Sequence, residues 1–387
     1  MKRFIVLAAM AATLAISCTK SELVPVANDN TISFLAANYV NGTKVTGSEF
    51  PKTEVFGAYA WTAGTSGDYF INNETVSYNE THDVWTTDTP YYWPKNQAVD
   101  FFCYYPVNTA GVPAVQQNKI TYSDIDFTAN QTDFMYADKA VGYTDNANQV
   151  EDGVSARGGV PTFFRHAGAQ VKINVILGEN EKEDAVSHTK TKWEVSLSEV
   201  VLSGLYTKGS CVLTLSGTDH GIIPWTKPED TDGYKVWTAV KTITNDTNNT
   251  LYKDVQLRNL VPNQGQTVIG PFYALPQTLV ADQQKISLKV TIKAYRMTAT
   301  QDANNDWVYP ENYPSDPYLT QSDKVFSADL LIDSGDANTS VFAWQMNQFV
   351  TYNITLGPAG QQITFDPAVD AWEAKTYGTN IDISLGM

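Results

Sequence analysis

The four histidines of this 387-residue chain, together with its acidic residues, are the first candidates for chemistry. His82, His166, His188 and His220 lie far apart, and none has the spacing of a metal site or stands beside a nucleophile motif. The sequence also lacks a G-x-S-x-G motif and a P-loop. EDTDG, from Glu229 to Gly233, resembles part of a calcium loop but lacks the remaining ligands. We therefore expect no catalytic residue, no metal site and no cofactor, and a hydrolase with paired carboxylates stays a minor alternative.

A cysteine near the start of the chain has a more specific pattern. Lys2 and Arg3 precede the apolar run FIVLAAMAATLAI, and Ser17 then leads into Cys18. Basic residues followed by a short apolar segment and a small residue are typical of a secretory signal peptide. The sequence LAISC resembles a bacterial lipoprotein signal, in which residues 1–17 are removed and Cys18 becomes the lipidated first residue. An ordinary secretory signal that is cleaved nearby is the alternative.

The other two cysteines, Cys103 and Cys211, leave two interpretations open. They could form one disulfide, because an exported protein folds outside the reducing cytoplasm. They lie in separate strand patterns, however, which favours two small buried apolar side chains.

Composition narrows the class of protein and of partner. The chain is 43% hydrophobic and 18% charged, as expected for a folded globular protein, and it is long enough for two domains. Its formal net charge of -16 would repel nucleic acid, so we expect no nucleic-acid partner.

Alternation of apolar and polar residues dominates from Thr31 onward and predicts strands rather than helices. QVKINVIL, KISLKVTIKAY and YNITL are examples, and clusters of Gly, Asn, Asp and Pro separate such runs. The alternating runs nearest the two ends of the chain are TISFLA and NIDISL. In TISFLA the apolar residues of one face are Ile32, Phe34 and Ala36. In NIDISL they are Ile381, Ile383 and Leu385. The pattern predicts an all-β protein built from sandwich-like sheets.

The expected organisation has four parts. A polar tether at residues 18–30 follows the signal, a first β-sandwich domain spans 31–160, and a second spans 161–387. The boundary is placed at the glycine-rich sequence SARGGVP, which precedes a strong strand pattern.

An aromatic segment, PYYWPKNQAVDFFCYYP from Pro90 to Pro106, could be a core strand or an exposed sugar-stacking platform. Val99, Phe101, Cys103 and Tyr105 alternate with Phe102 and Tyr104, so the strand is apolar on both faces. This favours a core strand, because a platform needs only one aromatic face.

The same segment carries a family resemblance. YYWP at 91–94 and VDFFCYYP at 99–106 resemble the first-domain signature of the fimbrillin-like proteins of Bacteroidetes, which are subunits of surface pili assembled from lipoprotein precursors. Further pieces that are similar to the family follow in the expected order: DFMYADKA, VPTFFRHAGAQVKINV, FYALPQTL, WQMNQFVTYNITL and ITFDPAVDAW.

The resemblance implies a fold and an assembly mechanism. The fold would be two transthyretin-like β-sandwich domains, and the lipid would carry the subunit to the outer membrane. A trypsin-like protease then cuts after a basic residue beyond the first strand, that strand leaves, and a strand of a neighbouring subunit fills the groove. The family usually has Arg at the cut, whereas this chain offers Lys44 in NGTKVTGS, or Lys52. TISFLA would be the strand that leaves and NIDISL the donor, and a subunit that is never cut would fit an anchor or accessory role.

We therefore expect a non-enzymatic pilus subunit at the cell surface, whose partners are other pilin subunits. The alternative is a surface glycan-binding lipoprotein, in which exposed aromatic residues of a long Pro- and Asn-rich loop stack on sugars. The candidates in that loop are Trp307, Tyr309 and Tyr313.

Overall fold

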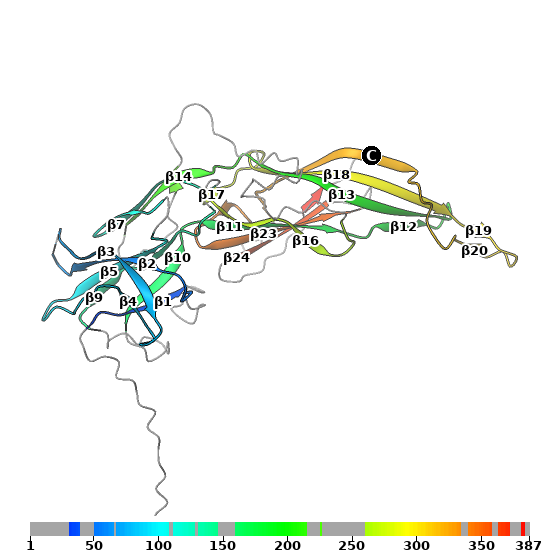
Figure 1. Cartoon of the computed structure of the whole chain (residues 1–387). Coiled ribbons are helices and arrows are strands. Elements are labelled where there is room, and N and C mark those ends of the chain that lie inside the picture. The colour runs from blue at the N-terminus through cyan, green and yellow to red at the C-terminus, as the bar shows by residue number, and fades with distance from the viewer. Residues whose placement is uncertain are drawn as a thin grey trace, which may run out of the picture.

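The structure, a computed structural model, describes most of the chain between residues 31 and 383. The described ranges are 31–38, 50–65, 67–107, 111–127, 131–145, 159–214, 225–226, 260–333 and 340–357, with the backbone of 363–371 and 381–383. Every regular element in them is a β-strand, which confirms the all-β fold (Figure 1). These ranges contain no helix long and apolar enough to cross a membrane. Cys18, Lys44, Leu385 and the EDTDG sequence lie outside the described residues.

The strands form where the sequence alternates. In β11 (Ala169–Leu177) every second residue is buried, and β10 (Val160–His166) has the same pattern. Strands turn successive side chains to opposite faces, so this period buries one row, which is apolar in β11 and mixed in β10, and leaves the other row half-buried.

An eight-stranded sheet forms the N-terminal body. Its order is β2-β3-β4-β1-β10-β8-β5-β9, and β2 also pairs with β5, so the sheet curls around and closes on itself. The enclosed core is rich in aromatic side chains. The strands of this sheet are β1 (Phe34–Asn38), β2 (Phe56–Thr62), β3 (Tyr69–Asn79), β4 (Val84–Thr87), β5 (Val99–Tyr105), β8 (Met135–Ala137), β9 (Ala140–Tyr143) and β10.

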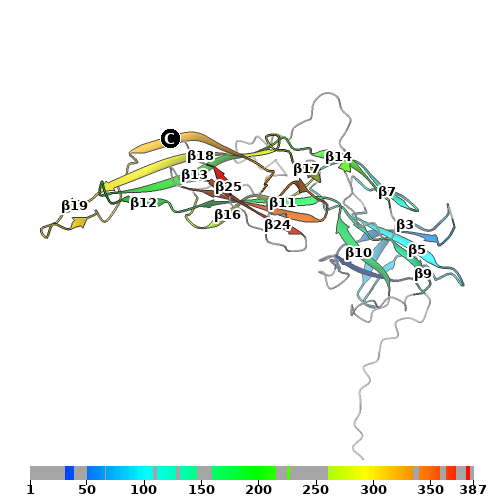
Figure 2. The same cartoon turned by 180° about the vertical axis from the view of Figure 1, so that it is seen from behind.

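The C-terminal region is a sandwich of a five-stranded and a four-stranded sheet, which extends away from the N-terminal body (Figures 1 and 2). The five-stranded sheet has the order β16-β11-β23-β24-β25, and the four-stranded sheet has the order β12-β13-β18-β21. Aliphatic side chains from both sheets fill the space between them. Besides β11, these strands are β12 (Glu181–Asp184), β13 (Thr189–Ser203), β16 (Gly265–Ala274), β18 (Lys285–Thr298), β21 (Leu319–Asp329), β23 (Gln348–Leu356), β24 (Ile363–Ala371) and β25 (Ile381–Ile383).

A smaller four-stranded sheet joins the two regions. Its order is β15-β14-β7-β6, with β6 (Ala114–Gln116) and β7 (Lys119–Asp126) from the first half of the chain and β14 (Lys208–Thr214) and β15 (Trp225–Thr226) from the second. Two further pairs are short: β17 (Gln277–Thr278) with β22 (Ala343–Trp344), and β19 (Thr300–Gln301) with β20 (Trp307–Val308).

The expected boundary at residue 160 differs from the arrangement in the structure. That residue begins β10, which pairs with β1 and β8 and therefore belongs to the N-terminal sheet. The chain passes between the two regions just after β10, where Ala167 N–H donates to the Phe134 carbonyl and Asn347 N–H donates to Gly168. The glycine-rich sequence therefore precedes a strand of the N-terminal sheet, and the boundary between the two regions follows that strand.

The aromatic segment of β5 is a core strand on both faces, as its alternation predicts. Phe101 and Cys103 point into the N-terminal core, whereas Phe102 and Tyr104 point into a second cluster shared with the joining sheet. Trp93, just before the strand, is also buried and packs edge-on against Phe101.

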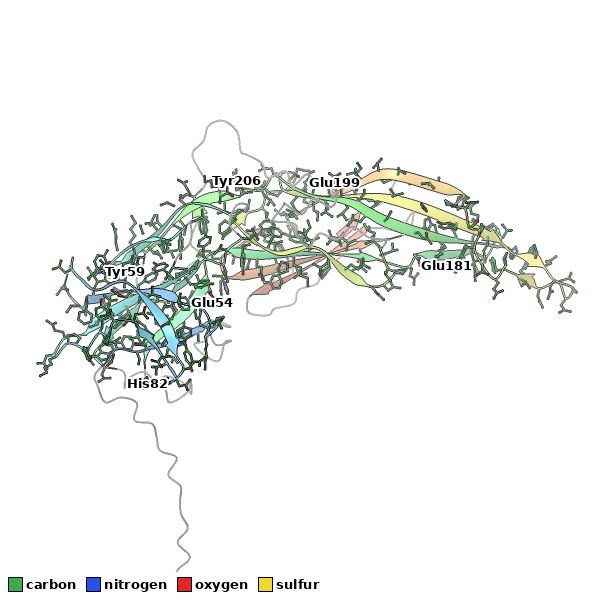
Figure 3. All side chains as sticks on the ribbon, viewed as in Figure 1. Glu54, Tyr59, His82, Glu181, Glu199 and Tyr206 are labelled. Carbon is green, nitrogen blue, oxygen red and sulfur yellow. The ribbon has the colours of Figure 1, made fainter. Side chains whose placement is uncertain are left out.

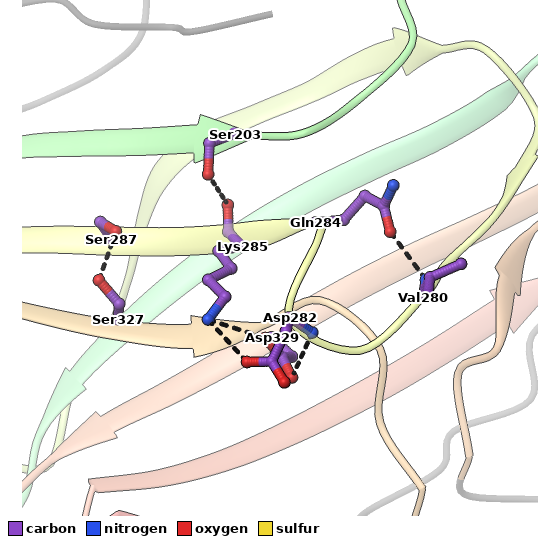
Figure 4. Close-up of polar contacts among 8 residues, drawn as sticks. All are labelled: Ser203, Val280, Asp282, Gln284, Lys285, Ser287, Ser327 and Asp329. Carbon is purple, nitrogen blue, oxygen red and sulfur yellow. Dashed lines mark hydrogen bonds and ion pairs between the residues drawn. The ribbon is translucent and has the colours of Figure 1, made fainter. Parts of the chain in front are cut away.

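Polar contacts fix the turn that leads into β18 (Figure 4). The buried Gln284 side chain accepts a hydrogen bond from Val280 N–H at 2.7 Å and donates to the Gly204 carbonyl at 3.0 Å. Lys285 Nζ lies 3.0 Å from Asp282 Oδ1 and 3.7 Å from Asp329 Oδ1. The buried amide satisfies two backbone groups that have no strand partner, so the turn has a defined shape.

Candidate strand-exchange site

The first strand is held unequally by its two neighbours. β1 runs parallel to β10 over the five pairs from Phe34–Val160 to Asn38–Phe164, but it meets β4 at a single pair, Phe34–Trp85. Before the strand, Ile32 N–H donates to the Tyr91 carbonyl at 2.8 Å. Most of its backbone hydrogen bonds are therefore made on one side.

The apolar face of this strand is part of the core. Ile32, Phe34 and Ala36 are all buried, as the alternation predicts. The Phe34 ring packs edge-on against Phe56 and Phe101, with centroid distances of 5.9 and 5.8 Å. Each large apolar side chain buried in this way stabilises the fold by about 1.5–3 kcal/mol, so loss of the strand would expose a groove that is unfavourable in water.

A glycine allows β10 to approach β1. A Cβ atom on Gly159 would lie 2.9 Å from the Phe34 carbonyl carbon and 3.0 Å from the Leu35 nitrogen. Both are backbone atoms, so they could give way only if the strand moved. In the sequence this glycine is only part of SARGGVP, which was interpreted as a domain boundary. The close approach of two strands cannot be predicted from composition.

The chain that follows the first strand returns to the core at Phe50. This ring is buried and contacts four others: Phe56, Trp85, Tyr105 and Phe164. Its role does not follow from the sequence, because an isolated Phe between polar residues belongs to no alternating run.

The two candidate cleavage residues lie on opposite sides of Phe50 in the sequence. Lys44 falls outside the described residues. Lys52 is exposed; its Nζ lies 2.7 Å from the Tyr78 hydroxyl, 3.6 Å from Asp83 and 4.2 Å from the centre of the Tyr78 ring. Its side chain is thus engaged by a neighbouring hairpin.

The candidate donor strand lies at an edge of the five-stranded sheet (Figure 2). β25 meets β24 at three residue pairs, from Ile363–Ile383 to Phe365–Ile381, whereas β24 meets β23 at eight. Few hydrogen bonds therefore hold it, and its outer edge has no strand partner among the described residues.

The remaining candidates for chemistry in the described residues include one histidine and two cysteines, and each is held inside the fold. His166 Nδ1 lies 2.7 Å from Asp133 Oδ1, and its backbone N–H donates to the Asn347 side chain, so it joins the two regions. Cys103 and Cys211 are buried and unpaired, and burial raises the pKa of both thiols. Within the ranges that the structure describes, no three His, Cys, Asp or Glu side chains are grouped to hold a metal ion.

Comparison with known proteins identifies the family. A family model described as Fimbrillin-like matches residues 43–372, and no curated protein matches. Similar solved structures include a fimbrial protein from Bacteroides vulgatus, with 16% identity, 88% of this chain and 99% of that chain covered, and a TM-score of 0.49. A fimbrilin from Porphyromonas gingivalis has 13% identity, coverage of 92% and 99%, and a TM-score of 0.37. The tip fimbrial protein Mfa3 of the same organism, with a C-terminal truncation, has 12% identity, coverage of 88% and 97%, and a TM-score of 0.34. Since the family model spans most of the chain, the protein belongs to the fimbrillin-like family.

Proposed function

We propose that the protein is a structural, non-enzymatic subunit of a cell-surface fimbria, built from two transthyretin-like domains and assembled by exchange of its first strand. It is exported as a lipoprotein through Cys18, reaches the outer membrane and is then trimmed by a trypsin-like protease. Its partners are other pilin subunits, each of which donates or accepts a strand. Family membership supports the fimbrial role, and the unequal pairing of β1 supports the exchange.

The position of β1 is the observation that carries the proposal. A strand that can be exchanged needs an apolar face whose burial stabilises the complex. Its neighbouring strands must also keep their structure after it has left. Phe34 supplies the face, and β10 remains as a template because β8 pairs with its other edge. An incoming strand would restore the hydrogen bonds along β10 and refill the apolar groove.

Cleavage after Lys44 suits this mechanism better than cleavage after Lys52. A cut after Lys44 leaves Phe50 on the retained chain, where its four ring contacts keep the groove in shape. A cut after Lys52 places Phe50 on the released piece, and loss of a buried Phe costs about 3–5 kcal/mol. The engagement of Lys52 with Tyr78 and Asp83 also hinders its entry into a protease.

The donor in this proposal is the segment that contains β25. It is short and lies at a sheet edge, and β24 is the strand that it meets within the described ranges. Release from its own sheet costs few hydrogen bonds, and Ile381 and Ile383 then alternate with a polar residue, as a groove-filling strand requires.

Mild trypsin treatment of the purified protein tests the proposal, with N-terminal sequencing and size-exclusion chromatography of the product. We expect a cut after Lys44 and conversion of the monomer into oligomers. Lys44→Gln should remain monomeric, whereas the matched variant Lys52→Gln should behave as wild type. Ile383→Asp should be cut but should not assemble, because it places a charge in the groove. A chain cut cleanly after Lys44 that stays monomeric at high concentration contradicts strand exchange.

A further inference from the structure

The far end of the C-terminal sandwich carries aromatic side chains that the fimbrial fold does not need for its core. β19 and β20 form a hairpin at the end farthest from the N-terminal body, beyond β12 (Figure 1; Glu181 marks β12 in Figure 3). Trp307 in this hairpin is 48% exposed, and Tyr309 follows two residues later. Large aromatic groups that are held at an exposed end, outside every core cluster, point to a binding surface.

Each of these two rings packs on a polar side chain of the hairpin formed by β12 and β13. The indole of Trp307 stacks on the imidazole of His188, with centroids 3.8 Å apart and an interplanar angle of 14°. Lys190 Nζ lies 4.6 Å from the centre of the Tyr309 ring, whose hydroxyl donates to Glu183 at 3.0 Å. Because Trp307 is 48% exposed although His188 stacks on one face of the indole, part of this side chain stays accessible to solvent.

Both rings contact the same neighbouring hairpin. His188 lies in the turn between β12 and β13, and Glu183 and Lys190 belong to these two strands. The Cα atoms of residues two positions apart, such as 307 and 309, are separated by at most about 7 Å. This spacing is comparable with the length of one to two sugar rings, so one extended chain of sugars can cover both aromatic groups.

Charge decides between a sugar and a protein as the occupant. Glu183 and Lys190 form an ion pair of 3.3 Å beside the rings, and Lys192 and Glu194 form another farther along β13. Cores of protein interfaces are depleted in Lys and Glu, because burial of such charges is costly. A sugar instead uses isolated ring faces for its C–H groups, and its hydroxyls bond to carboxylates and ammonium groups that stay partly hydrated.

We propose that this end of the molecule binds a neutral polysaccharide of β-linked hexopyranoses, by stacking on Trp307 and Tyr309. Most hydroxyls of such sugars are equatorial, and so is the β-linkage at C1, so the rings present flat C–H faces whose partial positive charge complements the negative face of an aromatic ring. The net charge of -16 of the whole chain disfavours an acidic polysaccharide. His188 and Lys190 hold the rings in place, which lowers the entropic cost of binding. The site lies outside the strand-exchange region and does not depend on it.

Native affinity electrophoresis tests this site directly, with cereal mixed-linkage β-glucan, glucomannan or xyloglucan in the gel and dextran, an α-linked glucan, as the reference. We expect at least one of the three β-linked polymers to retard the wild-type protein, and dextran to have no effect. Trp307→Ala and Tyr309→Ala should each weaken binding by about tenfold or more, as loss of a central aromatic contact does. Tyr309→Phe keeps the ring and should retain binding.

The matched control is Tyr92→Ala, which removes a half-exposed tyrosine from the other end of the molecule and should leave retardation unchanged. Thermal melting of each variant separates lost binding from lost folding, and we expect no change because the hairpin is outside the cores. The proposal is wrong if none of the three polymers retards the wild type, if the Trp307→Ala/Tyr309→Ala variant is still retarded, or if that variant changes only the oligomeric size.

Discussion

Replacement of Gly159 by alanine perturbs the packing of β1 against β10 without altering any side chain of β1. The new Cβ would lie 2.9 Å from the Phe34 carbonyl carbon, closer than real Cβ contacts allow, so β1 must shift away from β10. Overpacking of this kind costs about 1–3 kcal/mol. Gly159 does not have a positive φ, so alanine also lowers the entropy of the unfolded chain. This effect stabilises the folded state by about 0.4–1 kcal/mol and offsets part of the cost. We therefore expect a net destabilisation of about 1–2 kcal/mol, confined to the first strand.

Amide hydrogen exchange followed by mass spectrometry measures this effect segment by segment. Amides of residues 34–38 should exchange about 5–30 times faster in Gly159→Ala, while those of β18 should not change. Gly265→Ala is the matched control, because its Cβ would meet nothing nearer than 3.7 Å and it should be neutral or slightly stabilising. If residues 34–38 exchange at the wild-type rate in Gly159→Ala, β1 does not pack closely against β10 at this position.

Three other predictions address the turn, the tyrosines and the thiols. Gln284→Ala should lower the free energy of unfolding by about 2–4 kcal/mol, measured by urea denaturation, because it leaves two buried backbone groups without partners. Burial raises the pKa of Tyr104 from its ordinary value of 10.0 to about 12, so its neutral form is favoured in the fold. That contribution to stability is complete below pH 10.0 and should be lost as the pH rises towards about 12, seen as late appearance of tyrosinate absorption. Cys103 and Cys211 should not react with a thiol reagent until the protein is unfolded, and both should react afterwards.

The sequence predicted the strands better than it predicted their partners. Alternation identified β1, β11 and β18 and the faces that they bury, because the two-residue period of a strand is written directly in the order of residues. The joining sheet was not predicted, since β7 and β14 meet across a long stretch of sequence. Register and pairing depend on the fit of whole faces, and a single sequence does not contain them.

The candidate site was predicted in part for similar reasons. The apolar face of the first strand followed from the alternation of Ile32, Phe34 and Ala36. The supporting residues did not, because Phe50 acts through ring contacts with four strands, and Gly159 acts through the absence of a side chain. Both are properties of distances between segments.

Native mass spectrometry of material polymerised after trypsin treatment tests the replacement of β1 most directly. The peptide that ends at Lys44 contains β1, so its presence or absence in the polymer reports whether the strand has left. We predict that the uncut monomer contains this segment, that the polymer lacks it, and that its loss accompanies growth. Oligomers that retain the peptide in equal number with the subunits would show that β1 stays in its groove, and would contradict assembly by exchange of the first strand.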